Sequence, residues 1–302
     1  MDFIKKLIVL VLFTSAMYSQ TPLRKIFSFG FESKSLIGTD YVDSKIALRI
    51  LLREMGEKED VDIDVLFYDT QDDIIEDFVE KSKLDIIVKD IASYLDNYEK
   101  IESSSEFLWT LSTQKNSRYY QNYLIVNKNS NIKSLQDIKG KTLSIKEHDS
   151  LGKIWLDKIV LEKIQKSYVD VIGNQKKVSK MSRVVLSVLF GKADFAVVSK
   201  ETWETMIELN PAIKNKIDVL TQSELIFIPI IGAVRKAESS DNTKQVFLRK
   251  FIDTANRIEE SVHNKQIRTL IKFEYVYILK RDDLKELFKF YDEYKLLRKK
   301  YL

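Results

Sequence analysis

Residues 134–157 read SLQDIKGKTLSIKEHDSLGKIWLD, and they contain a helix start, a turn, a strand and a second helix start in close succession. Ser134, with an aspartate three residues later, is typical of a capped helix N-terminus. Gly140 predicts a turn, and the residues after it predict a strand over 141–145. An amphipathic helix is expected to follow at 151–166. This alternation of short helices and strands indicates an α/β protein.

The same alternation continues along most of the chain, which predicts βαβ units with mostly parallel sheets. The predicted strands outside residues 134–157 are Lys25–Phe31, Val61–Tyr68, Leu84–Val88, Gln121–Asn127, Tyr168–Ile172, Ala193–Val198 and Leu225–Val234. The predicted helices are Asp40–Met55, the segment that Thr70 and Asp73 open as a capping box, Ile91–Asn97, Ser182–Phe190, Lys200–Leu209, Thr243–Val262 and Asp282–Lys300. No repeat and no Pro/Gly/Ser-rich linker divides these units into consecutive domains.

Two further segments carry recognisable motifs. Residues 185–198, VLSVLFGKADFAVV, contain a helix, a Gly-Lys-x-Asp turn and a buried strand. Residues 79–95 contain KSKLDIIVKDIASYL, a buried strand followed by a tyrosine-bearing helix. Together with residues 134–157, and in the same order, they resemble motifs of the phosphate/phosphite/phosphonate-type family of periplasmic substrate-binding proteins. The resemblance spans residues from about 25 to 260.

The resemblance implies a type II periplasmic binding protein, in which two lobes, each a mostly parallel sheet flanked by helices, are joined by two crossover strands. Lobe one would comprise residues 20–121 plus 226–302, and lobe two residues 122–225. The crossovers would be Tyr120–Asn127 and Phe227–Val234. A ligand would bind in the cleft between the lobes, at loops that follow the carboxyl ends of strands.

The N-terminus has the layout of a secretory signal peptide, predicted over residues 1–19. Lys5 and Lys6 precede the apolar run Leu7–Phe13, and small residues follow up to Ala16. This layout is typical of an exported protein, and the run is too short to span a membrane. The alternative is a short anchor that stays attached.

The absence of cysteine indicates the cellular compartment in which the protein is expected. The chain has no Cys, so it offers no site for the lipid anchor that retains exported binding proteins in cells with one membrane. A soluble exported protein is retained where an outer membrane encloses it. We therefore expect the protein in the Gram-negative periplasm.

Composition also excludes several functional classes. The chain has no G-x-G-x-x-G or P-loop motif, no H-E-x-x-H and only two His, so no cofactor and no metal site are expected. The 49 Lys and Arg are interspersed with 45 Asp and Glu, a balance that argues against nucleic-acid binding. Zero Cys also argues against porphobilinogen deaminase chemistry, which uses similar lobes but needs a cysteine for its cofactor.

In lobe two the candidate ligand-binding residues are His148, Asp149, Ser150 and Gly152, at a helix N-terminus that can hold an anion. In the family, hydroxyl groups and backbone amides at this loop hold the phosphate or phosphonate. Here only Ser150 keeps a hydroxyl, and a carboxylate at position 149 would repel an oxyanion. The alternative is that Asp149 or Ser150 simply caps the helix. The consecutive residues 148–150 do not predict a hydrolase triad, because neighbours in sequence point apart.

The remaining candidates follow other strands or begin a crossover. They are Ser28, Lys34, Lys89, Ser93, Tyr94, Tyr120 and Ser199. Lys34 or Lys89 could pair with an acidic ligand, or could be solvated surface charges. Tyr94 and Tyr120 could contact the ligand, or could pack within the lobes.

These observations predict a non-enzymatic, monomeric periplasmic protein that binds a small polar ligand, with an anionic, phosphonate-like one as the family default. It would deliver that ligand to an inner-membrane ABC permease. The alternative is a ligand sensor that works with a membrane histidine kinase, because a free sensor has the same sequence features.

Overall fold

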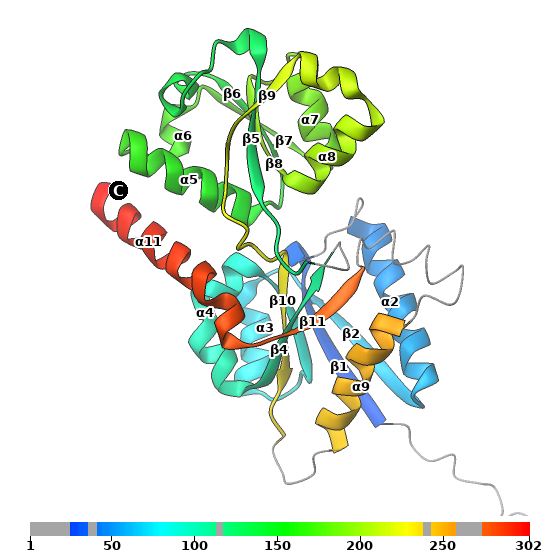
Figure 1. Ribbon diagram of the computed structural model, residues 1–302. Coiled ribbons are helices and arrows are strands. Elements are labelled where there is room, and N and C mark those ends of the chain that lie inside the picture. Colours follow the sequence, from blue (N-terminus) through cyan, green and yellow to red (C-terminus); the bar gives the residue numbers. More distant parts are fainter. Residues whose placement is uncertain (1–24, 36–40, 113–116, 238–242, 258–273) are drawn as a thin grey trace, which may run out of the picture.

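The computed structural model describes residues 25–35, 41–112, 117–237, 243–257 and 274–302 of the chain. Its strands form two separate sheets that lie one above the other in Figure 1. The predicted signal peptide, residues 1–19, lies outside the described residues. No helix in the described segments combines the length and the apolarity that a membrane span requires.

The first sheet has six strands in the order β11-β4-β10-β3-β1-β2. Their bounds are β1 Lys25–Glu32, β2 Val61–Tyr68, β3 Ile86–Asp90, β4 Ser105–Ser112, β10 Ile230–Arg235 and β11 Tyr275–Leu279. The half formed by β2, β1 and β3 is parallel, as the sequence predicts. The strand β10 is inserted antiparallel between β3 and β4, so a late segment of the chain lies in the middle of this sheet.

The second sheet has five strands in the order β7-β6-β8-β5-β9, all from a continuous part of the chain. Their bounds are β5 Asn122–Asn127, β6 Thr142–Lys146, β7 Asn174–Val178, β8 Phe195–Ser199 and β9 Ile217–Gln222. Again the first half, β7, β6 and β8, is parallel, and β5 runs antiparallel to both of its neighbours. The two sheets therefore repeat one mixed pattern, parallel in one half and antiparallel in the other, where the sequence predicted mostly parallel sheets.

Helices cover both sheets (Figure 1). They are α2 Tyr41–Lys58, α3 Gln71–Ile75, α4 Ile91–Ser104, α5 Ser150–Ile164, α6 Tyr168–Val171, α7 Met181–Leu189, α8 Lys200–Leu209, α9 Thr243–Arg257 and α11 Lys285–Tyr301. The predicted Thr70 cap is confirmed, since its hydroxyl accepts a hydrogen bond from the backbone N–H of Asp73 at 3.3 Å. α11 follows a strand of the six-stranded sheet, yet it runs along α5 of the other sheet (Figure 1).

The chain passes between the sheets through two adjacent segments. Tyr120 and Phe227 form an antiparallel bridge there, with the Tyr120 N–H donating to the Phe227 carbonyl at 2.8 Å. The rings of the same two side chains pack against each other, with centroids 5.8 Å apart and planes tilted by 42°. These are the first residues of the two predicted crossover segments, 120–127 and 227–234.

The predicted strand at 168–172 is wrong. Tyr168–Val171 forms the short helix α6, and the strand comes later, as Asn174–Val178. The side chain of Asp157 explains the difference, because it accepts hydrogen bonds from the Ser167 hydroxyl at 2.6 Å and the Tyr168 N–H at 2.9 Å. Such a contact from outside the segment overrides the strand propensity of its β-branched residues.

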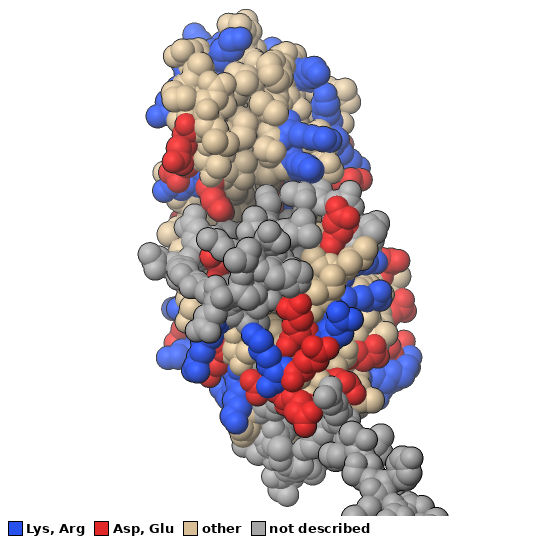
Figure 2. Space-filling model, turned by 90° about the vertical axis from the view of Figure 1, so that its right-hand side faces the viewer, with Lys and Arg blue, Asp and Glu red and all other residues tan. Residues whose placement is uncertain are grey.

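Charged side chains of both signs are interspersed on the visible face of the six-stranded sheet's half of the molecule (Figure 2). Lys and Arg there do not gather into a continuous basic stripe (Figure 2). This arrangement agrees with the balanced charge of the sequence.

Candidate ligand-binding site

A cavity of about 730 Å³ lies between the two sheets, within the range of small-ligand sites. Its lining comes from both sheets and from the crossing segments between them. The lining includes a set of polar side chains from both sheets and from one crossing segment, namely Asp90, Tyr120, Asn122, Asp149, Ser150 and Ser199. The cavity therefore touches both halves of the molecule at once.

The N-terminus of α4 reaches the cavity from the six-stranded sheet. Asp90, the last residue of β3, caps this helix: its Oδ1 accepts from the N–H groups of Ala92 at 3.0 Å and Ser93 at 3.4 Å. An aspartate at this position satisfies amides that have no partner inside the helix. The amide groups of Ala92 and Ser93 are therefore already bound.

The N-terminus of α5 reaches the cavity from the five-stranded sheet, and it is capped in the same way. Asp149 Oδ1 accepts from the Gly152 N–H at 2.9 Å. A Cβ atom built on Gly152 would lie 2.1 Å from Asp149 Oδ2, so the carboxylate occupies the space that the glycine leaves open. The alternative that Asp149 is a helix cap is thus the arrangement in the structure.

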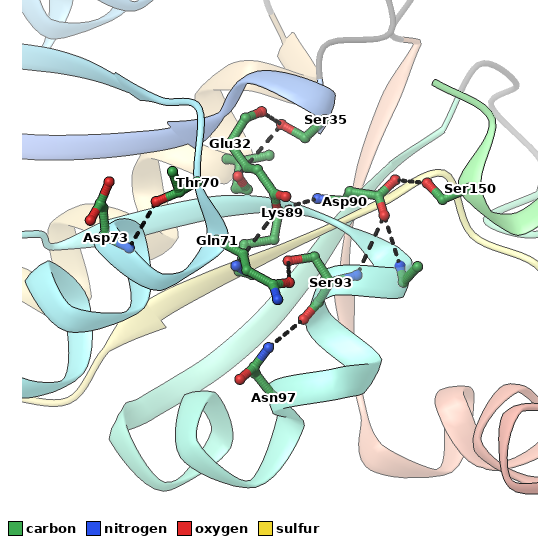
Figure 3. A network of polar contacts seen from close by, with 12 residues as sticks. Glu32, Ser35, Thr70, Gln71, Asp73, Lys89, Asp90, Ser93, Asn97 and Ser150 are labelled. Carbon is green, nitrogen blue, oxygen red and sulfur yellow. Dashed lines mark hydrogen bonds and ion pairs between the residues drawn. The ribbon is translucent and has the colours of Figure 1, made fainter. Parts of the chain in front are cut away.

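A hydrogen bond joins the two helix starts. The Ser150 hydroxyl donates to Asp90 Oδ2 across the cavity, as Figure 3 shows. Burial raises the pKa of Asp90 to about 6, against the opposing hydrogen bond from Ser150. Burial likewise raises the pKa of Asp149, and it holds the pKa of the nearby Tyr120 well above its usual value, with the negative charges of Asp149 and Asp90 adding to the effect.

Behind Asp90 lies a buried ion pair (Figure 3). Lys89 Nζ is 3.6 Å from Glu32 Oε2, and the same carboxylate oxygen accepts from the Asp90 N–H at 3.3 Å. Lys89 is fully buried, and burial lowers its pKa despite the nearby Glu32. The pair fixes the end of β3 and hence the position of the Asp90 cap.

A family model for the periplasmic substrate-binding proteins of ABC phosphonate transporters matches residues 41–255. The chain belongs to this family. It is therefore a periplasmic substrate-binding protein of the ABC-transporter type, whose family works in the periplasm with a small-molecule ligand and a membrane permease. No match was found among curated proteins.

Solved structures confirm the fold. The binding component of an ABC phosphonate transporter from Pseudomonas aeruginosa superposes with a TM-score of 0.62 at 18% identity, covering 91% of this chain and 88% of that one. PhnD1 from Prochlorococcus marinus in complex with methylphosphonate gives 0.61 at 12% identity, covering 89% and 98%. The aliphatic sulphonate binding protein SsuA from Escherichia coli gives 0.53 at 12%, covering 91% and 87%. The predicted two-lobe α/β architecture is thereby confirmed.

The structure brings one part of the predicted site together. The predicted residues that line the cavity are Tyr120, His148, Asp149, Ser150 and Ser199. Ser199 also caps α8, since its Oγ accepts from the Thr202 N–H at 3.3 Å. Gly152 lies beneath the Asp149 carboxylate.

The lobe-one predictions lie elsewhere. β1 runs to Glu32 and pairs with β2 along its whole length, so Ser28 is in mid-strand and not beyond the strand end. β3 runs to Asp90, two residues further than predicted, so Lys89 lies inside the sheet and forms an ion pair with Glu32. The side chain of Lys34 lies outside the described part of the chain.

Two further lobe-one candidates are buried away from the cavity lining. The Ser93 hydroxyl donates to Gln71 Oε1 at 2.9 Å. Tyr94 is fully buried, donates to Glu102 at 2.7 Å and packs against Phe288. Tyr94 therefore packs within its lobe, which is the stated alternative to contact with the ligand.

Sequence reasoning missed Asp90 and Asn122. Asp90 could have been found, since an aspartate directly before the apolar residues of a helix is an N-cap signal. Asn122 begins β5, and nothing in its local sequence distinguishes it from other strand residues. In the described residues no group of three His, Asp or Glu side chains is arranged to hold a metal ion.

Proposed function

We propose that the protein captures a small polar ligand in this cavity and delivers it to an inner-membrane ABC permease. The observation that carries the proposal is that the cavity has walls from both sheets, with Asp90 of one half bonded to Ser150 of the other. A ligand that contacts both walls stabilises the arrangement in which they are close. Uptake and release would then follow from a hinge motion about the crossing segments.

The proposal includes the lobe boundaries, the export route and the mode of action. Residues 20–121 plus 226–302 would form lobe one, residues 122–225 lobe two, and residues 1–19 a signal peptide. The protein would work as a monomer and would catalyse no reaction. In support of the latter, the family to which the chain belongs consists of solute-binding proteins of transporters.

Ligand capture is tested by thermal-shift screening against phosphonates, phosphate, sulfonates, amines, amino acids and sugars, followed by small-angle scattering with each hit. We expect at least one class to raise the melting temperature and to decrease the radius of gyration. Ser150→Ala should weaken binding of that ligand, whereas Ser103→Ala, on an exposed side chain outside the cavity lining, should not. Stabilisation without compaction, or equal binding by both variants, would contradict capture between the lobes.

Delivery is tested in proteoliposomes that contain a candidate ABC permease and its ATPase. The loaded protein should stimulate ATP hydrolysis and ligand uptake. If it instead activates a membrane histidine kinase and leaves every such permease unaffected, the sensor alternative is correct and import is wrong.

A further inference from the structure

The cavity presents carboxylates at the two places where the fold would otherwise present free amides. Helix N-termini attract anions because their first N–H groups lack partners and carry partial positive charge. Here the Gly152 N–H is bound by Asp149, and the Ala92 and Ser93 N–H groups are bound by Asp90. The space above Gly152 is filled by the Asp149 carboxylate itself.

Acceptors remain without partners in the same lining. Asp149 is 9% exposed, and its Oδ2 is buried and has no hydrogen-bond partner. Asn122 is only 1% exposed, and neither its Oδ1 nor its Nδ2 has a partner. Buried polar atoms are nearly always paired, so these unpaired atoms at the cavity wall point to a group that a ligand supplies.

The lining also contains cations, namely Arg118, Lys146, Lys180 and Lys200. The charges of Lys146 and of Lys153 partly offset the effect of burial on the pKa of Asp149. Two of the lining cations form ion pairs with carboxylates. Arg118 lies 2.6 Å from Asp283, and Lys200 lies 3.9 Å from Glu204. Lys153, near Asp149 but outside the lining, donates to the Glu147 carbonyl at 2.5 Å. An oxyanion would have to compete for Arg118, Lys153 and Lys200, and at the two helix starts it would lie beside carboxylates, whereas a cation would meet unpaired acceptors there.

We propose that the centre of the cavity binds a protonated amine, held by Asp149 and Asn122 beside Asp90, and that it disfavours phosphonates and other oxyanions. An ammonium group supplies both the N–H donors that Asp149 Oδ2 and Asn122 Oδ1 lack and the charge that compensates two buried carboxylates. The unpaired Asn122 Nδ2 favours a ligand that also carries an oxygen acceptor. This inference rests on the proposed function and names the ligand class of that same site.

Burial provides independent support. It raises the pKa values of both Asp90 and Asp149, so each ionised carboxylate is held at a cost that a bound cation would reduce. A bound oxyanion would add negative charge beside both groups and increase that cost.

The test is titration calorimetry with ethanolamine, methylphosphonate and ethylene glycol at neutral pH. Ethanolamine carries an ammonium group and a hydroxyl, and ethylene glycol has the hydroxyl groups without the charge. We expect the wild-type protein to bind ethanolamine and neither of the other two. Asp149→Asn, which keeps a capping side chain, should weaken ethanolamine binding about tenfold or more, the loss expected for one charge-assisted hydrogen bond. Asp170→Asn, an exposed substitution outside the lining, should leave it unchanged.

A second variant tests the exclusion of oxyanions. Asp149→Ser restores a small hydroxyl residue at the helix start and removes the charge, so it should gain methylphosphonate binding. If wild-type protein binds methylphosphonate in the cavity and not ethanolamine, this inference is wrong while ligand capture stands. If ethanolamine does not bind and Asp149→Ser gains no methylphosphonate binding, the inference is also overturned, and the wider ligand screen still decides the proposed function.

Discussion

Asp90 is a buried carboxylate that belongs to both halves of the molecule. Its Oδ1 caps α4 and its Oδ2 accepts from Ser150 at the start of α5. The side chain is 7% exposed, and burial raises its pKa from 3.8 to about 6. In this pH interval the folded protein binds more protons than the unfolded chain, so folding is less favourable at neutral pH than in mild acid.

We expect Asp90→Asn to show this penalty directly. Asparagine also caps helices and accepts from a serine hydroxyl, but it does not ionise. Between about pH 4 and pH 7 the wild type should lose stability relative to the variant, by on the order of 3 kcal/mol if the whole shift is expressed. Chemical denaturation of both proteins across this range measures the difference. A difference that is independent of pH would show that Asp90 titrates normally.

The lobe-one residues show why the sequence predicted only part of the site. Lys89 was assigned to a loop because β3 was predicted to end at Val88, two residues before it does. Ser28 lies within the strand that the sequence itself predicts, and it does not reach the cavity lining. Successive strand residues point to opposite faces of the sheet. An error of one or two residues in the end of a strand can therefore assign to the cleft a side chain that lies in the protein interior. The partner of Lys89, Glu32, is distant in the chain, and no local pattern indicates that pairing.

At the scale of elements, the start of α5 depends on a close fit between Asp149 and Gly152. We expect Gly152→Ala to displace the carboxylate and to destabilise the protein by about 1 kcal/mol through loss of the cap. In an Asp149→Ala background the same change should be neutral or stabilising, because alanine favours helix more than glycine does. Denaturation of the four proteins of this cycle gives both values. Equal effects in the two backgrounds would contradict the fit.

Elements with strong local signals were predicted closely. The strand Val61–Tyr68 and the helix Lys200–Leu209 have the predicted bounds. The strand Ser105–Ser112 was missed because it follows α4 without an intervening loop or turn residue. The strand Asn174–Val178 was missed because its sequence, NQKKV, is polar, as suits an edge strand that pairs on one side only.

At the scale of the whole molecule, α11 connects the two halves. The Tyr291 hydroxyl donates to Asp96 of α4 at 2.5 Å, and the Tyr294 hydroxyl donates to Asp157 of α5 at 3.0 Å. Arg298 lies 3.5 Å from the same Asp157. The amphipathic pattern of 282–300 predicted the helix but not these partners, because an apolar face does not specify what covers it.

We expect Tyr294→Phe to loosen this connection. Loss of a hydrogen bond to a buried carboxylate should lower the free energy of unfolding by about 1–2 kcal/mol. Hydrogen exchange should accelerate in the last turns of α11 and in α5, and should be unchanged in β1 and β2. Tyr98→Phe is the matched control, since its hydroxyl bonds only the neighbouring Glu99 at the surface. If exchange in α11 is the same in wild type and Tyr294→Phe, the helix does not depend on this bond.

The late position of β10 in the chain has a consequence for biogenesis. All strands of the five-stranded sheet lie between residues 122 and 222, so they can pair as soon as that part has been synthesised or translocated. β3 and β4 emerge earlier but leave open edges until residues 230–235 arrive to lie between them. Exposed edges are sites of mispairing and aggregation. The six-stranded sheet contains the first strand of the chain but is the last sheet to be completed. Until then, the exposed edges of β3 and β4 are the places where a chaperone would have to prevent mispairing.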